Sequence, residues 1–109
     1  MEFNRGKIKA AAIDLTLDKS THLPSRITAV NACAELRASE IVPEVRKIFN
    51  TIENDTAQRI SAIETIGELG NAEDLKNLQQ ILQNSNPIYH RPLRKAMKKT
   101  SSKKSKRQI

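Results

Sequence analysis

The sequence predicts an all-α protein, a short α-solenoid of about six helices stacked as helical hairpins. The first observation behind this prediction is a repeat: RITAVNACAEL at 26–36 returns, in altered form, as RISAIETIGEL at 59–69. The second is the spacing of apolar residues, which recur every three or four positions, as in an amphipathic helix. No stretch alternates apolar and polar residues for long enough to indicate a strand. A helical unit written twice in 109 residues indicates a repeat architecture.

The two copies agree at their apolar positions and at several charged ones. Identical pairs are Arg26/Arg59, Ile27/Ile60, Ala29/Ala62, Glu35/Glu68, Leu36/Leu69, Glu40/Glu73 and Ile48/Ile81. Other apolar residues are exchanged for apolar residues, and the single cysteine, Cys33, stands where the second copy has Ile66. We therefore expect Cys33 to be a small buried residue of the core.

The pattern divides the chain into units. Two full units, 23–50 and 55–84, each contain two amphipathic helices, and together with a half unit at each end they form a solenoid domain over residues 1–99. The half unit 5–17 lies one repeat interval before the second helix of the first full unit, so it is a second helix whose first helix is missing. Residues 87–99 begin another first helix.

Local signals mark the helix ends. Asp55 or Thr56 is expected to cap the first helix of the second full unit, and Asn71 the helix after it. Ser39 is the candidate N-cap at the matching place in the first full unit. Gly70 is expected to end its helix in the left-handed conformation.

These units resemble HEAT repeats, especially the short HEAT-like type associated with phycobilisome lyases. The resemblance rests on Arg59, Ala62, Ile63 and GELG at 67–70, and on second helices written SEIVPEVRKIF and AEDLKNLQQIL. It covers residues 23–97, although the first copy has Ala34 where the second has a glycine. It implies the fold; its implication for function is broad, because HEAT arrays serve many unrelated roles.

The net charge of +7 is unevenly distributed. Residues 1–90 carry ten basic and twelve acidic residues, whereas residues 91–109 carry nine basic residues and no acid. The stretch 100–109 has no apolar residue before the terminal isoleucine, and we expect it to be a disordered basic tail.

Basic residues are the candidate contacts for a partner protein or a polyanion. Arg26 and Arg59 hold the same repeat position and, with Arg91 or Arg94, are candidates for a basic ridge along the stack. The alternative interpretation pairs each arginine with a neighbouring acid, for instance Arg59 with Asp55. The remaining candidates belong to the last helix and the tail: Lys95, Lys98, Lys99, Lys103, Lys104, Lys106 and Arg107.

Other chemistry is not indicated. One cysteine excludes an internal disulfide and a cysteine-based zinc site. His22 and His90 have no partner at metal-ligand spacing and read as loop or capping residues. We expect no cofactor and no enzymatic activity. No apolar run reaches the length of a membrane span, the N-terminus lacks the apolar core of a signal peptide, and the chain is expected to be cytoplasmic.

Three hypotheses follow for function. The first is a non-enzymatic scaffold or adaptor that binds a protein partner, with homo-oligomerisation through the exposed ends of the solenoid as a related expectation. The second is a nucleic-acid-associated protein whose tail and basic ridge contact the phosphate backbone; with no aromatic interleaved among the basic residues, base-specific reading is not expected. The third, an accessory to a lyase-type enzyme, rests on the resemblance alone.

Overall fold

The computed structural model describes residues 5–51, 54–84 and 86–107, with residues 5 and 102–107 described by their backbone alone. Within these residues the chain forms six α-helices and two short 3-10 helices, and no strand. The α-helices are α1 (Arg5–Leu17), α2 (Leu23–Glu35), α3 (Val42–Asn50), α4 (Thr56–Leu69), α5 (Asp74–Asn84) and α6 (His90–Arg107). The 3-10 helices are η1 (Ser39–Ile41) and η2 (Pro87–Tyr89). The predicted all-α class is confirmed.

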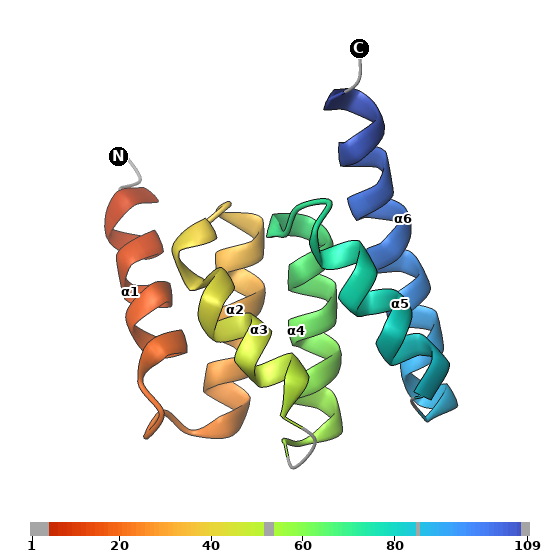
Figure 1. Ribbon diagram of the computed structural model, residues 1–109. Coiled ribbons are helices and arrows are strands. Elements are labelled where there is room, and N and C mark those ends of the chain that lie inside the picture. The colour runs from red at the N-terminus through yellow and green to blue at the C-terminus, as the bar shows by residue number, and fades with distance from the viewer. Residues whose placement is uncertain (1–4, 52–53, 85, 108–109) are drawn as a thin grey trace.

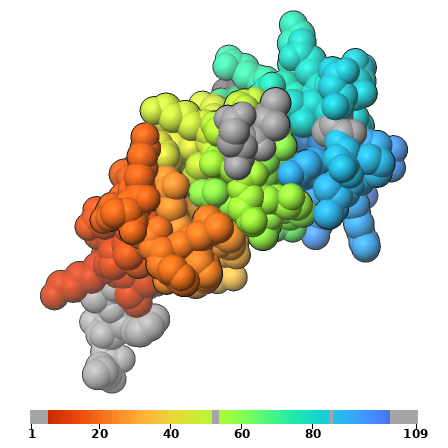
Figure 2. All heavy atoms as spheres, turned by 90° about the horizontal axis from the view of Figure 1, so that it is seen from below, coloured from red at the N-terminus to blue at the C-terminus, as the bar shows by residue number. Residues whose placement is uncertain are grey.

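The helices form two layers of a single stack (Figure 1). In one layer α4 lies between α2 and α6, and in the other α1, α3 and α5 each pack against the helix that follows in the chain. Helix α1 lies at one end of the stack and α6 at the other (Figure 2). The molecule measures 44 × 39 × 19 Å, and its smallest dimension matches two layers of helices about 10 Å wide. The predicted stack of helical hairpins is confirmed.

The core runs between the layers and is built from aliphatic side chains. Fully buried residues include Ile41, Val45, Phe49, Ile63, Ile66, Leu78 and Leu93. Cys33 belongs to the same cluster, which confirms the position predicted from its match with Ile66. Burial raises the pKa of the Cys33 thiol, so this thiol stays protonated and packs as a small apolar group.

A left-handed residue was expected at the end of α4, but the structure has one at the end of α2. Arg37 has a φ of 59°. The Ala38 amide donates to the Cys33 carbonyl at 2.9 Å and the Arg37 amide donates to the Ala34 carbonyl at 3.3 Å, the bonding pattern of a Schellman motif.

Gly70 ends α4 as predicted, but the left-handed conformation predicted for it was wrong. Gly70 has an extended conformation, with φ −73° and ψ −175°, and its amide donates a hydrogen bond to the Ile66 carbonyl. Space explains the glycine instead: a Cβ there would lie 2.5 Å from the Ile66 carbonyl oxygen and 2.6 Å from Asp74 Oδ2. The glycine therefore lets α5 begin close to the end of α4.

Of the two caps predicted in the second full unit, Asp55 is confirmed: it is the N-cap of α4, and its Oδ2 accepts a hydrogen bond from the Ala57 amide at 2.9 Å. Asn71 Oδ1 accepts a hydrogen bond from the Glu73 amide at 2.9 Å, but α5 begins only at Asp74, so this bond belongs to the turn before the helix. The expectation for Ser39 was wrong, because Ser39 lies inside η1 and α3 begins only at Val42, without a side-chain cap. A 3-10 turn supplies the entry to α3 in place of a capping side chain.

Helix α6 is longer than predicted. Its backbone is helical through Arg107. From the sequence, the helix was expected to end at residue 99 and a disordered tail to begin at residue 100. Lysine and arginine are good helix formers, and no glycine or proline follows Pro92. Thr100 is also fully buried, so this turn packs against the domain, and its hydroxyl donates to the Ala96 carbonyl one turn earlier in α6 at 3.1 Å.

The spacing of the repeat changes at α6. Ala62 and Ile66 of α4 correspond to Ala96 and Thr100 of α6, and all four are buried. The interval between these corresponding residues is longer by a single residue than the interval from Arg26 to Arg59. The extra residue brings Leu93 to the position that corresponds to Arg59. The arginine of the two full units therefore has no counterpart in α6.

Candidate interaction surfaces

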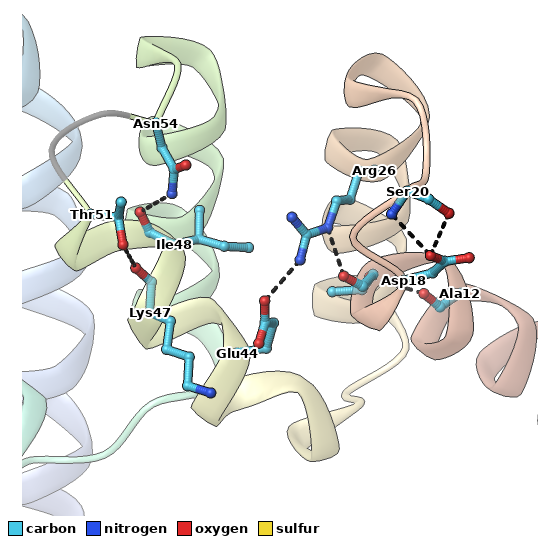
Figure 3. Close-up of polar contacts among 10 residues, drawn as sticks. Ala12, Asp18, Ser20, Arg26, Glu44, Lys47, Ile48, Thr51 and Asn54 are labelled. Carbon is cyan, nitrogen blue, oxygen red and sulfur yellow. Dashed lines mark hydrogen bonds and ion pairs between the residues drawn. The ribbon is translucent and has the colours of Figure 1, made fainter.

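Arg26 is an internal clamp between three helices. It lies in the first turn of α2; its Nε donates to the Thr16 carbonyl of α1 at 2.7 Å, and its Nη2 donates to Glu44 Oε2 of α3 at 2.8 Å (Figure 3). The side chains of Arg26 and Glu44 are 11% and 14% exposed. The Thr16 carbonyl belongs to the last turn of α1, where carbonyl groups lack helical partners. Arg26 therefore caps one helix while it pairs with another.

Arg59 repeats this arrangement at the equivalent position of the second full unit. Its Nε donates to the Phe49 carbonyl in the last turn of α3 at 3.1 Å. Its guanidinium carbon lies 4.8 Å from the centroid of the Tyr89 ring, within range of a cation–π contact, and the residue is 9% exposed. The carboxylate of Asp55, the neighbour suggested by the sequence, accepts from the Ala57 amide. The structure places both repeat arginines in internal contacts, not on an exposed ridge.

The other basic candidates lie on α6. Arg91, Arg94, Lys95 and Lys98 are exposed, and their spacing of three and four residues puts them along one side of the helix. Lys99 instead forms an ion pair with Glu68 of α4. The backbone of the last four candidates is helical, and their side chains lie outside the described part of the chain: Lys103, Lys104, Lys106 and Arg107. For these four, polyanion contact stays a prediction.

A cavity of about 350 Å³ opens between α2, α4 and α6. Its lining mixes three glutamates with two lysines of α6: Glu35, Glu64, Glu68, Lys95 and Lys99. The Lys99–Glu68 pair is held at this cavity, so one of the two basic groups is already neutralised by the protein itself. The mixed charge suits a polar surface between helices and selects neither an anion nor a cation.

An apolar groove lies at the other end of the stack, between α1 and α2. This N-terminal groove has a volume of about 560 Å³ and is lined by Ile8, Ala11, Ala12, Leu15, Pro24, Ser25, Thr28, Ala29 and Ala32. Of the five large apolar side chains that are exposed in the described part of the chain, four belong to α1 or to the start of α2: Ile8, Leu15, Leu17 and Leu23. No motif in the sequence marks this groove. The missing first helix of the half unit 5–17 was the signal that could have found it.

The described residues contain no group of three or more histidine, cysteine, aspartate or glutamate side chains that could hold a metal ion. Among the same residues, no helix combines the length and the apolar character needed to cross a membrane.

The fold and these surfaces define an α-solenoid, in which paired helices stack and bury their faces against neighbouring pairs. A protein-family model described as HEAT repeats matches residues 10–102. The chain belongs to the HEAT repeat family, whose members generally act as scaffolds for protein–protein interaction. No curated protein and no solved structure matched the chain in the two further searches.

Proposed function

We propose that this protein is a non-enzymatic scaffold or adaptor module that binds a protein partner through the N-terminal groove. The observation that carries the proposal is the concentration of exposed apolar side chains at α1 and α2. Contiguous apolar surface is uncommon on soluble proteins unless it binds something, because its exposure to water is unfavourable. Membership of the HEAT repeat family supports the same function.

Comparative affinity purification from the native host tests this function. The bait is the full chain in three forms: wild type, the double variant Ile8→Ser/Leu15→Ser, and the control Ile88→Ser. Ile88 is also an exposed large apolar residue, but it lies in η2, outside the groove. We expect a specific partner to be recovered with wild type and Ile88→Ser and to be lost with the double variant. Recovery of one and the same set of proteins with all three baits would overturn the proposal.

A second candidate function is contact with nucleic acid through α6. It is favoured by the side of this helix that carries Arg91, Arg94 and Lys98, all exposed. Such contacts neutralise phosphates and release counterions, so binding weakens steeply as salt rises. Arg26 and Arg59 are engaged inside the domain, and the candidate contacts are those of α6 and the residues after it.

Fluorescence anisotropy with a labelled DNA duplex, titrated at several salt concentrations, tests this candidate. The triple variant Arg91→Gln/Arg94→Gln/Lys98→Gln is compared with Lys47→Gln, a control that removes an exposed charge from α3. We expect the triple variant to bind at least about tenfold more weakly at low salt and to show a shallower salt dependence, by about 0.9 in logarithmic slope for each lost phosphate contact. Equal binding by the triple variant and the control would exclude α6 as the contact.

A further inference from the structure

The N-terminal groove has an internal counterpart that shows what fits it. Each residue that lines the groove has an equivalent in the next repeat, at the interval that separates Arg26 from Arg59. These equivalents lie on η1, α3 and α4, and we call them the α3–α4 face: Ile41, Glu44, Val45, Ile48, Ala57, Gln58, Ser61, Ala62 and Thr65. Both sites are thus formed by the same pair of repeat positions, a second helix and the first helix that follows it.

Exposure is the main difference between the two sites. Leu15 is 46% exposed, whereas Ile48 at the equivalent position is 3% exposed. Ile8 is 38% exposed and its equivalent Ile41 is fully buried. Thr28 of α2 is exposed, while its equivalent Ser61 of α4 is buried. These three repeat positions are therefore covered in the α3–α4 face and uncovered in the N-terminal groove.

Helix α2 provides the cover of the α3–α4 face. It lies beside α4, and Asn31 Oδ1 accepts a hydrogen bond from the Ser61 hydroxyl at 2.7 Å. Val30 and Cys33 of α2 belong to the same core cluster as Val45 of α3. The covering element is therefore an amphipathic helix that presents small or branched apolar side chains together with a polar group for a buried hydroxyl.

Charge argues against a second copy of this chain as the occupant of the N-terminal groove. In head-to-tail stacking, α6 would enter the groove. Lys98 and Ser101 of α6 stand where α4 has Glu64, which lines the cavity shared with α6, and Gly67, which packs on Ala96 of α6; Arg94 stands where α4 has Ile60. The N-terminal segment 5–26 carries five basic and two acidic residues, and two of the basic ones, Lys9 and Arg26, pair with Glu40 and Glu44. This segment offers no excess of acid to pair with Arg94 and Lys98, and burial of an unpaired lysine or arginine is costly.

We propose that the N-terminal groove binds an amphipathic helix of a partner protein, with small apolar residues on the buried face and acidic residues along its flank. This helix takes the position on α1 and α2 that α2 takes on α3 and α4. The segment 5–26 beside the groove has more basic than acidic residues, which favours acidic residues along the flank of the bound helix. The proposal rests on the proposed function and specifies the class of partner.

Three labelled peptides serve as probes in fluorescence anisotropy with the full-length chain. The acidic peptide has the sequence of residues 22–36 with Arg26→Gln, Cys33→Val, Thr28→Glu and Ala32→Glu. The basic peptide carries lysine in place of both introduced glutamates, and the third peptide has the sequence of residues 89–107 to represent a second copy. We expect the acidic peptide to bind at least about tenfold more tightly than the other two at low salt.

The same titrations use two variants of the full-length chain. Leu15→Ser is expected to weaken binding of the acidic peptide about tenfold, and Ile88→Ser to leave it unchanged; circular dichroism checks that both variants keep their helices. Tighter binding of the 89–107 peptide, or equal binding of the acidic and basic peptides, would overturn the proposal. The absence of binding by all three peptides would also overturn the proposal. If the host partner were nevertheless lost with the Ile8→Ser/Leu15→Ser bait, the proposed function would stand, and only the acidic helix as the occupant of the groove would be wrong.

Discussion

The N-terminal groove and the α3–α4 face are built on the same repeat positions, but only the α3–α4 face is covered by a neighbouring helix. The difference is not one of hydrophobicity, because Leu15 is as apolar as its buried equivalent Ile48. It is one of neighbours, since each unit of a solenoid is completed by the unit before it. At the opposite end of the stack, α6 exposes arginine and lysine side chains. The two ends of the molecule are thus suited to different partners.

The largest expected effect compares Ile48 with Leu15. Ile48→Ala removes a buried side chain and leaves a cavity, and we expect it to lower the free energy of unfolding by about 2–5 kcal/mol. Leu15→Ala should lower it by less than about 1 kcal/mol, because this side chain is already half exposed. Urea denaturation of both variants measures the difference. Equal losses would mean that the N-terminal groove is covered in the protein alone.

The clamp at Arg26 is expected to rank second. Arg26→Met leaves Glu44 without its partner in a site that is only slightly exposed, and we expect a loss of about 2 kcal/mol in the free energy of unfolding. The matched control is Arg37→Met, because the Arg37–Glu68 pair is longer, at 3.8 Å, and Arg37 is 70% exposed. That control should cost less than about 0.5 kcal/mol. A similar cost for both would argue that the clamp is a surface ion pair.

The contact between α4 and α6 provides the third test. A Cβ on Gly67 would lie 3.0 Å from the Ala96 Cα and 3.2 Å from its Cβ, so Gly67→Leu should force the helices apart and cost about 1–3 kcal/mol. The matched variant is Ala34→Leu, at the equivalent position of α2 on the rim of the 350 Å³ cavity, where extra methylene groups have space. Thermal denaturation should show the larger fall in Tm for Gly67→Leu. The reverse order would contradict the close approach of α6.

The smallest expected effect concerns Asp18, in the turn after α1. Hydrogen bonds from the Ser20 hydroxyl and the Ser20 amide, at 2.7 and 2.9 Å, lower the pKa of Asp18 from its ordinary value of 3.8. The ionised carboxylate therefore stabilises the folded state at neutral pH, and this contribution is lost as the pH falls below 3.8 through the lower folded-state pKa.

Stability measured against pH tests this contribution. Asp18→Asn should be slightly less stable than wild type at pH 7, and the difference should fade as the pH falls below 3.8. Asp14→Asn, which changes another exposed carboxylate on the preceding helix, is the control. A difference between Asp18→Asn and wild type that persists at low pH would exclude the proposed role of the turn.

Much of the fold could be predicted from the sequence, because the repeat reports the same helical pattern twice. The agreement of Cys33 with Ile66 was enough to place Cys33 in the core. Helix ends were harder: the left-handed residue is Arg37, and its conformation is fixed by hydrogen bonds from the Arg37 and Ala38 amides to carbonyls of α2, for which no particular side chain is required. The continuation of α6 was missed because its composition resembles that of disordered tails, whereas Thr100 is fixed by packing.

The candidate site could be predicted less well. The repeat identified Arg26 and Arg59 as special, but their shared role is to bond a carbonyl ten residues earlier in the chain, a contact that only the packing of helices reveals. The N-terminal groove has no motif at all. It is defined by a helix that is missing from the pattern, and the exposure of Leu15 follows from that absence.

The two arginine clamps also affect how the stack opens. Each one ties the end of a helix in one unit to the first helix of the next, so local unfolding of either helix must break the hydrogen bond between them. The corresponding position in α6 is Leu93, which cannot make this bond. The arginine clamp thus couples neighbouring units at the first two junctions, whereas the third junction relies on the packing of Leu93 and on the Lys99–Glu68 ion pair. Amide hydrogen exchange is accordingly expected to be fastest in α6, with α1 to α4 opening as one cooperative block.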